Sequence, residues 1–202
     1  MPSKNIVDNQ LRKNRRIIVF IAAMSLIPFA IAWYLAKHPD KVSLGTNNGV
    51  LIQPPLPTAL TDFVGYDEFS AKNIRELQGR WVMINLMPQA VCNPACDDGL
   101  VKTRQISLMM GKDIARIRRV LLFPGRDNQD LPKPWQEDAR LLKAVASDTL
   151  WQSFVRLNLT ATEGGLVIMD PLGNLMMHYP PGYDPYKVRN DLSKLLRISQ
   201  IG

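Results

Sequence analysis

The sequence predicts an α/β domain in which helices cover a mixed sheet, preceded by one membrane-spanning helix. Three observations support this: an uncharged apolar run near the N-terminus, short apolar runs that alternate with helical patterns, and two strand-like runs joined by a tight turn. Of the 202 residues, 46% are hydrophobic and 21% are charged, which suits one globular domain with additional segments. This composition excludes a disordered chain, a collagen, a disulfide-dense small scaffold and a transporter with many spans.

A membrane-spanning helix is predicted at residues 17–36, which contain no Asp, Glu, Lys or Arg. A helix of that length spans roughly 30 Å, the thickness of the hydrocarbon core of a bilayer. Membrane helices tolerate a proline such as Pro28, and Trp33 and Tyr34 lie at the end where aromatic rings favour the interface. The alternative is a cleaved signal peptide, because residues 30–32 (Ala-Ile-Ala) resemble a cleavage site. Apolar character continues past that site, which favours an uncleaved anchor.

Positive charge is concentrated before this helix. Residues 1–16 carry five basic groups and one acidic group, so they supply +4 of the formal net charge of +7. The positive-inside rule then places this tail in the cytoplasm and exports everything after about residue 37. We therefore expect a single-pass membrane protein with an exported C-terminal domain, which would lie in the periplasm if the source is a Gram-negative bacterium. Because the rest of the chain is close to neutral, no nucleic-acid partner is expected.

The chain is expected to divide into four parts. Glycine, asparagine and a Pro-Pro-x-Pro cluster in residues 37–60 interrupt helices and central strands, which indicates a spacer. The predicted parts are a cytoplasmic basic tail (1–16), the transmembrane helix (17–36), the spacer (37–60) and an exported domain (61–202).

The first half of the domain contains two predicted strands and a helix. The apolar run at residues 80–87 ends before a proline and predicts a buried strand. A helix-start signature follows, because Asn93 can cap and Pro94 suits the first helical position. This helix should continue to about Met110. Residues 118–123 then form a second apolar run, which predicts a second strand.

The second half of the domain ends in a hairpin and a helix. Residues 136–146 and residues 150–155 both show helical patterns of apolar side chains. The runs 165–170 and 174–179 flank Pro-Leu-Gly and predict a β-hairpin. A last amphipathic helix is expected after Asp184.

Cys92 and Cys96 are the only cysteines of the chain. In an exported domain such a pair tends to be oxidised. If Asn93 caps the helix, both sulfurs lie near its positive end, which favours thiolate over thiol, whereas Asp97 and Asp98 oppose it. A bridge across so short a loop stabilises the whole fold weakly. These arguments favour a functional pair, with a local structural bridge as the alternative.

The Cys-x-x-x-Cys loop lies between two strands at a helix start, and the late hairpin reads LVIMDPLGN over residues 166–174. Together these features resemble the Sco family, which are membrane-anchored thioredoxin-fold proteins that assist copper delivery to cytochrome c oxidase. The basic tail, single anchor and proline-rich segment are similar to Sco-like membrane proteins of the proteobacterial cytochrome c oxidase assembly type. The resemblance covers residues 15–199 and implies a thioredoxin-like fold.

Two positions differ from the Sco pattern. Asp97 follows the second cysteine where Sco proteins have proline, and the stretch 160–165 lacks the Sco histidine. Two cysteinates alone can hold Cu(I), a soft ion that accepts few ligands. The resemblance therefore implies a possible Cu(I) site at Cys92 and Cys96. His178, the only histidine inside the domain, is a candidate replacement ligand, although a hydrogen-bonded histidine within the sheet is the simpler interpretation.

The resemblance implies a role in cytochrome c oxidase assembly, in which the reduced pair hands on Cu(I) or reduces cysteines of an oxidase subunit. Cys92 would attack and Cys96 would resolve, as in a thiol-disulfide oxidoreductase, with an oxidase subunit or a copper chaperone as partner. One alternative is a non-catalytic assembly partner with a structural disulfide, and another is a general periplasmic oxidoreductase. No phosphate-binding loop, dinucleotide fingerprint or Ser-His-Asp arrangement occurs in the sequence.

Overall fold

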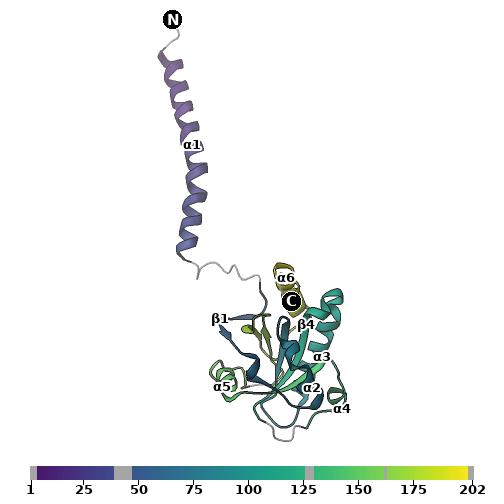
Figure 1. Ribbon diagram of the computed structural model, residues 1–202. Coiled ribbons are helices and arrows are strands. Elements are labelled where there is room, and N and C mark those ends of the chain that lie inside the picture. The colour runs from purple at the N-terminus through teal and green to yellow at the C-terminus, as the bar shows by residue number, and fades with distance from the viewer. Residues whose placement is uncertain (1–3, 39–46, 126–129, 162, 200–202) are drawn as a thin grey trace. The chain divides into compact units, whose positions relative to one another are not determined.

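The computed structural model describes residues 4–38, 47–125, 130–161 and 163–199, with side chains from residue 12 onward (Figure 1). The chain divides into two compact units, Met1–Thr46 and Asn47–Gly202.

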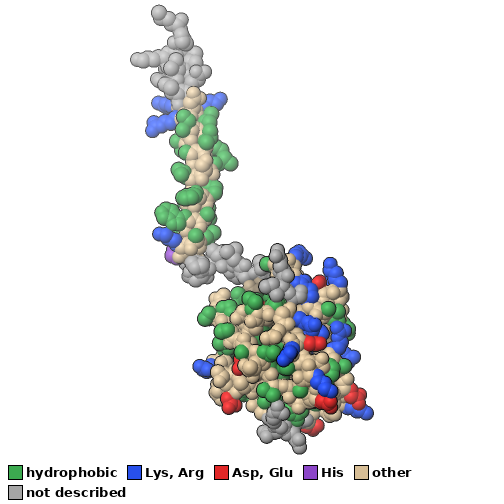
Figure 2. Space-filling view, viewed as in Figure 1, with side chains coloured by type: hydrophobic (Ala, Val, Ile, Leu, Met, Phe, Trp, Pro, Cys, Tyr) green, Lys and Arg blue, Asp and Glu red, His purple; other side chains and the backbone are tan. Residues whose placement is uncertain are grey.

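The N-terminal unit is a single helix, α1 (Lys4–Lys37). Within it, Arg12–Lys37 has a mean hydropathy of 2.3, long and apolar enough for a membrane span. Figure 2 shows apolar side chains along α1 after the basic residues near its start. The helix extends beyond the predicted span on both sides, and Pro28 lies inside it.

The second unit is built on a seven-stranded sheet with the order β1-β7-β6-β3-β4-β5-β2. The pairs β3–β4 and β4–β5 are parallel and the others are antiparallel, so the sheet is mixed as predicted. The strands are β1 (Val50–Pro57), β2 (Phe63–Gly65), β3 (Trp81–Leu86), β4 (Ile117–Phe123), β5 (Leu141–Ala146), β6 (Leu166–Met169) and β7 (Asn174–Tyr179).

Helices cover both faces of the sheet (Figure 1). Alternate residues of β3 point to opposite faces, as in any strand. On one side Val82 and Ile84 pack with Phe154 of α5; on the other, Met83 packs with Ile106 of α3 and with the apolar side of α6. The helices are α2 (Glu68–Asn73), α3 (Pro94–Met109), α4 (Lys133–Gln136), α5 (Asp148–Arg156) and α6 (Pro185–Ile198), with short 3-10 turns η2 (Leu60–Asp62), η3 (Ile74–Leu77) and η4 (Gly111–Arg116).

Most of the predicted elements are confirmed. The apolar runs form β3 and β4, the Pro-Leu-Gly signal joins β6 to β7, and the helices predicted after Asn93 and Asp184 are α3 and α6. The pattern over residues 150–155 lies in α5. Strand β3 is buried along its whole length and β4 at every residue except the partly buried Arg118, which explains why both read as nearly continuous apolar runs rather than alternating ones.

The helix predicted at residues 136–146 is wrong over nearly its whole length, because α4 ends at Gln136 and residues 137–140 are not helical. Residues 141–146 form β5, which lies between β4 and β2, and all six are buried. A short apolar run fits a buried helix and a buried strand equally well, so its periodicity does not distinguish them. Pairing with the two neighbouring strands decides in favour of the strand.

The spacer predicted at residues 37–60 is also wrong over much of its length. The compact domain begins at Asn47, and residues 50–57 form β1, which pairs with β7 at the edge of the sheet. Prolines lack a backbone N–H and are therefore excluded from central strands, but an edge strand tolerates them. The pairing accommodates them with a register shift between Leu51 and Leu56.

A buried carboxylate fastens the start of the domain to α6. Asp191 is 2% exposed and accepts hydrogen bonds from the backbone N–H of Asn48 (2.6 Å) and of Gly49 (3.2 Å). It also accepts from the Asn48 side chain (2.9 Å) and from the Tyr179 hydroxyl (2.9 Å). Burial is the largest cause that raises the pKa of Tyr179, and the hydrogen bond to Asp191 raises it further.

Candidate functional site

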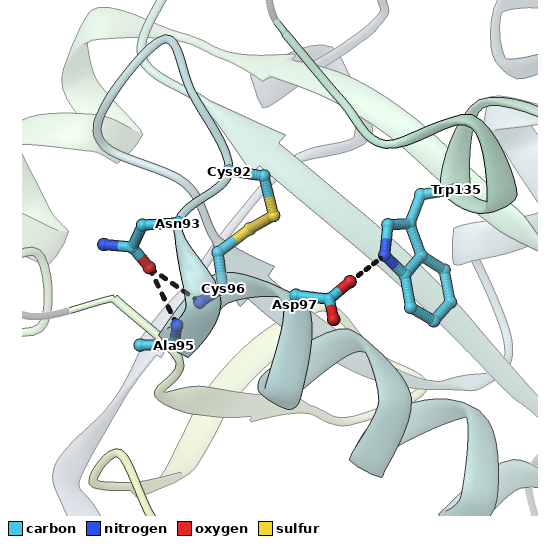
Figure 3. Close-up of a disulfide and its surroundings, with 6 residues drawn as sticks. All are labelled: Cys92, Asn93, Ala95, Cys96, Asp97 and Trp135. Carbon is cyan, nitrogen blue, oxygen red and sulfur yellow. Dashed lines mark hydrogen bonds between the residues drawn. A yellow bond between two sulfur atoms is a disulfide. The ribbon is translucent and has the colours of Figure 1, made fainter.

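The two cysteines form a disulfide at the N-terminus of α3, with their Cα atoms 5.3 Å apart (Figure 3). The Asn93 side chain accepts hydrogen bonds from the backbone N–H of Ala95 and of Cys96, both at 3.0 Å. This confirms the predicted cap. Cys92 therefore lies just before the helix and Cys96 in its first turn, where the helix dipole stabilises negative charge on sulfur.

Two backbone hydrogen bonds with Asp130 position the loop that carries Cys92. After β3 the chain turns, and Cys92 donates its backbone N–H to the carbonyl oxygen of Asp130 at 3.1 Å. Asp130 in turn donates its N–H to the carbonyl of Ala90 at 2.7 Å. These two bonds fix the approach of the loop to α3, so the disulfide has a defined place at the end of the sheet.

The two sulfurs differ in their access to solvent. Cys96 is 3% exposed and belongs to an apolar cluster with Met87, Leu100 and Phe123. Cys92 is partly exposed and packs at the edge of that cluster. An incoming thiolate can therefore reach Cys92, with Cys96 behind it as the leaving group.

The two aspartates after Cys96 have partners of their own. Asp97 accepts a hydrogen bond of 2.6 Å from the indole N–H of Trp135, a buried residue of α4, and Figure 3 shows its carboxylate turned away from the disulfide. Asp98 pairs with Lys102 one turn further along α3, with 2.6 Å between the nitrogen and the oxygen. Because both carboxylates have partners, they destabilise a cysteine thiolate less than the sequence alone predicts.

A third carboxyl group, which the sequence did not single out, belongs to the segment that packs against the cysteine turn. Glu163 is 6% exposed, and within the described part of the chain neither of its buried side-chain oxygens has a hydrogen-bond partner. Burial raises the pKa of Glu163. The backbone N–H groups of Asn93 and Gln89 face the carboxyl and offset part of that rise, although neither reaches hydrogen-bonding geometry.

Gly164 brings this segment against the cysteine turn. Its φ is +81°, and a Cβ atom at this position would lie 2.4 Å from the carbonyl oxygen of Ala95, the residue before Cys96. Gly99 of α3 has little room for a side chain, because its Cβ would lie 3.2 Å from the Cα of Gly164. The signal for this contact was the Gly-Gly pair that follows Glu163, since glycine permits close backbone approach.

His178 and the cysteines lie on opposite faces of the sheet. His178 pairs with Val167, which pairs with Ile84, so these three side chains share the face that α5 covers. Cys96 belongs to the cluster beneath α3 on the other face. Burial lowers the pKa of His178. The structure thus brings Cys92 and Cys96 together and places His178 on the other face of the sheet, and the described residues hold no group of three metal-ligating side chains.

The chain matches one family model and is distantly similar in structure to several solved proteins. A family model described as "Transmembrane-like, thioredoxin-like, C-terminal domain" matches residues 81–199. Copper-bound ScoI of Arabidopsis thaliana is 18% identical with a TM-score of 0.47, covering 62% of this chain and 89% of that chain. Copper-bound yeast Sco1 is 16% identical with a TM-score of 0.48, covering 61% and 82%. Apo Sco1 from Thermus thermophilus is 14% identical with a TM-score of 0.49, covering 76% and 99%.

No curated protein matches the sequence. The matched region contains the Cys-x-x-x-Cys turn, the central strands and the terminal hairpin and helix, and it spans more than half of the chain. The predicted thioredoxin-like fold is therefore confirmed, and the chain belongs to the family of transmembrane-like proteins with a thioredoxin-like C-terminal domain.

Proposed function

We propose that this protein is a single-pass protein of the bacterial inner membrane whose periplasmic domain performs thiol–disulfide exchange during cytochrome c oxidase assembly. The observation that carries the proposal is the asymmetric disulfide at the N-terminus of α3, with Cys92 partly exposed and Cys96 buried. This is the arrangement that a nucleophile and a resolving cysteine require. The link to the oxidase comes from the resemblance to the Sco family.

The reduced pair would act on a disulfide of an oxidase subunit. The Cys92 thiolate attacks one sulfur of that disulfide and forms a mixed disulfide, while the other client sulfur leaves as a thiolate. The Cys96 thiolate then attacks the Cys92 sulfur, which releases the reduced client and restores the Cys92–Cys96 bond. The dipole of α3 stabilises both thiolates. The released client cysteines are then free to receive copper.

Replacement of both cysteines by serine tests this function in the cell. Oxidase activity and the copper content of the purified oxidase are expected to fall strongly, while the variant accumulates to the normal level in membranes. Normal oxidase at normal levels of the variant would contradict the proposal and favour a non-catalytic assembly partner. The single variant Cys96→Ser is expected to trap a mixed disulfide between Cys92 and an oxidase subunit, and Cys92→Ser serves as its control. Trapping of many unrelated exported proteins would instead favour a general oxidoreductase.

Transfer of Cu(I) as cargo is the second candidate. Its support is the position of two sulfurs on one helical turn, because a soft ion such as Cu(I) accepts two thiolates. The full chain, reduced in detergent, is expected to bind one equivalent of Cu(I) in competition with a chelator of known affinity. The double serine variant is the control. Binding no stronger than in that control would remove copper transfer and leave thiol exchange unaffected.

A further inference from the structure

A small cleft rich in arginine lies beside the second half of α3. It has a volume of about 130 Å³ and is formed by α3, η4, the start of β4 and the turn before β5. Arg104, which lines it, lies eight residues after Cys96 in α3, or about 12 Å along the helix axis. The cleft is therefore separate from the cysteine turn, and the thiol exchange proposed above gives it no role.

The charged side chains around this cleft do not balance. Four arginines and one aspartate line it, which leaves a formal charge of +3: Arg104, Arg118, Arg119, Arg140 and Asp138. Glu76 pairs with Arg118 from outside the lining and divides its charge with Arg80, so at least +2 remains. Among the ion pairs of the described residues, none includes Arg104 or Arg140, and both side chains are exposed.

Arg119 is the buried member of this group. It is 3% exposed and donates from Nη2 to the Asp138 carboxylate at 2.6 Å. Its other terminal nitrogen, Nη1, is buried and has no hydrogen-bond partner within the described part of the chain. Burial lowers the pKa of Arg119, the contact with Asp138 opposes this, and the charges of Arg104 and Arg140 lower it further. A guanidinium group keeps its proton in proteins, so the cleft holds an excess of positive charge.

An oxyanion is the ligand that compensates such a charge. Burying a charge is costly unless it is paired, and Asp138 is the one acid in the lining. Guanidinium groups bind phosphate and carboxylate oxygens through two parallel N–H donors. A phosphate group offers at least three acceptor oxygens and a carboxylate only two, so phosphate is better suited to several arginines at once. The volume is below the roughly 300 Å³ of a pocket for a drug-sized molecule, which favours a single phosphate group.

We propose that this arginine cleft binds a phosphate group, which comes either from free phosphate or from the headgroup of an anionic lipid. The exposed guanidinium groups of Arg104 and Arg140 donate to the phosphate oxygens, and the charge of buried Arg119 attracts the group into the cleft. Asp138 holds Arg119 in place and also repels the anion, so binding requires both exposed arginines. A lipid is a possible source because α1 contains a candidate membrane span. The proposal does not depend on the chemistry of the cysteines.

Calorimetric titration of the full chain with inorganic phosphate tests this site. The oxidised protein is kept in an uncharged, phosphate-free detergent at constant ionic strength, and the wild type is expected to bind one equivalent. Arg104→Gln/Arg140→Gln should bind at least about tenfold more weakly, because it removes two charged donors. The matched control is Arg156→Gln/Lys187→Gln, which removes two exposed positive charges outside the cleft and should bind like the wild type. Equal affinity in the two double variants would overturn the proposal.

Thermal unfolding protects the test against misfolding of the variants. Without phosphate, both double variants should melt close to the wild type, since all four substituted side chains are exposed. Phosphate should raise the melting temperature of the wild type, because a ligand that binds only the folded state stabilises it. It should leave Arg104→Gln/Arg140→Gln unchanged relative to chloride at the same ionic strength. A wild type that responds equally to phosphate and chloride would contradict a specific site.

Two further titrations distinguish the source and the chemistry of the ligand. A short-chain phosphatidic acid that binds more tightly than inorganic phosphate, with the excess lost in Arg104→Gln/Arg140→Gln, would assign the cleft to a lipid headgroup. Equal or weaker binding of that lipid would assign it to free phosphate. Acetate is expected to bind at least about tenfold more weakly than phosphate, because it carries fewer acceptor oxygens and less charge. Acetate that binds as tightly as phosphate would overturn the proposal in favour of a site for carboxylates.

Discussion

Replacement of Gly164 by alanine is expected to destabilise the folded domain by about 3 kcal/mol. Two effects add: an L-residue at positive φ costs about 1 kcal/mol, and overpacking against a rigid backbone costs about 1–3 kcal/mol. The new methyl group would lie 2.4 Å from the carbonyl oxygen of Ala95, so the segment or the cysteine turn must move. Thermal unfolding followed by circular dichroism, on the full chain in detergent, measures the loss.

Gly182→Ala is the matched control for this substitution. Gly182 has the same φ of +81°, but nothing lies within 4 Å of the position where its Cβ would be. Its cost should therefore be the conformational one alone, about 1 kcal/mol. Gly164→Ala should also change the rate at which dithiothreitol reduces the disulfide, and Gly182→Ala should not. Equal melting temperatures for the two variants would show that the packing of Gly164 on Ala95 is not tight.

Removal of the Asp191 carboxylate has the second large effect that we expect. Asp191→Ala leaves the buried Tyr179 hydroxyl and the backbone N–H groups of Asn48 and Gly49 without their acceptor. The Tyr179 hydroxyl and the Gly49 N–H are the two buried donors among them. Each unsatisfied buried donor costs about 1–3 kcal/mol, so the domain should lose about 2–5 kcal/mol of stability. Denaturant unfolding measures the loss, and hydrogen exchange at Asn48 and Gly49 should accelerate.

The neighbouring Asn190→Ala provides the comparison for Asp191→Ala. Asn190 is exposed on α6, and its side chain accepts a hydrogen bond only from exposed Arg189 among the described contacts. Its replacement should change stability by no more than about 0.5 kcal/mol. If the two variants unfold at the same denaturant concentration, the Asp191 network does not hold the start of the domain.

The sequence was sufficient to predict an element correctly where its local signal agreed with the tertiary packing. Asn93 followed by proline predicted the start of α3, and hence the place of both cysteines, because a cap depends on residues within one turn. The hairpin of β6 and β7 followed from its turn residues for the same reason.

The elements and the residue that the sequence did not predict correctly depend on contacts with residues far away in the chain. Residues 141–146 are a strand because they pair with β4 on one side and β2 on the other. Residues 50–57 are a strand because they pair with the side of β7 that faces away from β6. The segment of Glu163 reaches the cysteine turn only through the packing of Gly164 on Ala95, across about 70 residues of chain. No short-range pattern contains that information. The resemblance to the Sco family pointed to this stretch for a missing histidine, and a buried acid is found there instead.

The prolines of β1 also determine how copies of the domain behave when many of them are confined to one membrane. An exposed sheet edge with a full row of donors and acceptors is a template on which a second chain can add a strand, the first step of aggregation. Three of the eight residues of β1 are prolines, which offer no N–H, and the opposite edge is β2, with only three residues. Both edges of the sheet are thus poor templates for an added strand. Copies of the domain concentrated at a membrane surface should therefore not pair edge to edge, and their disulfides should stay accessible.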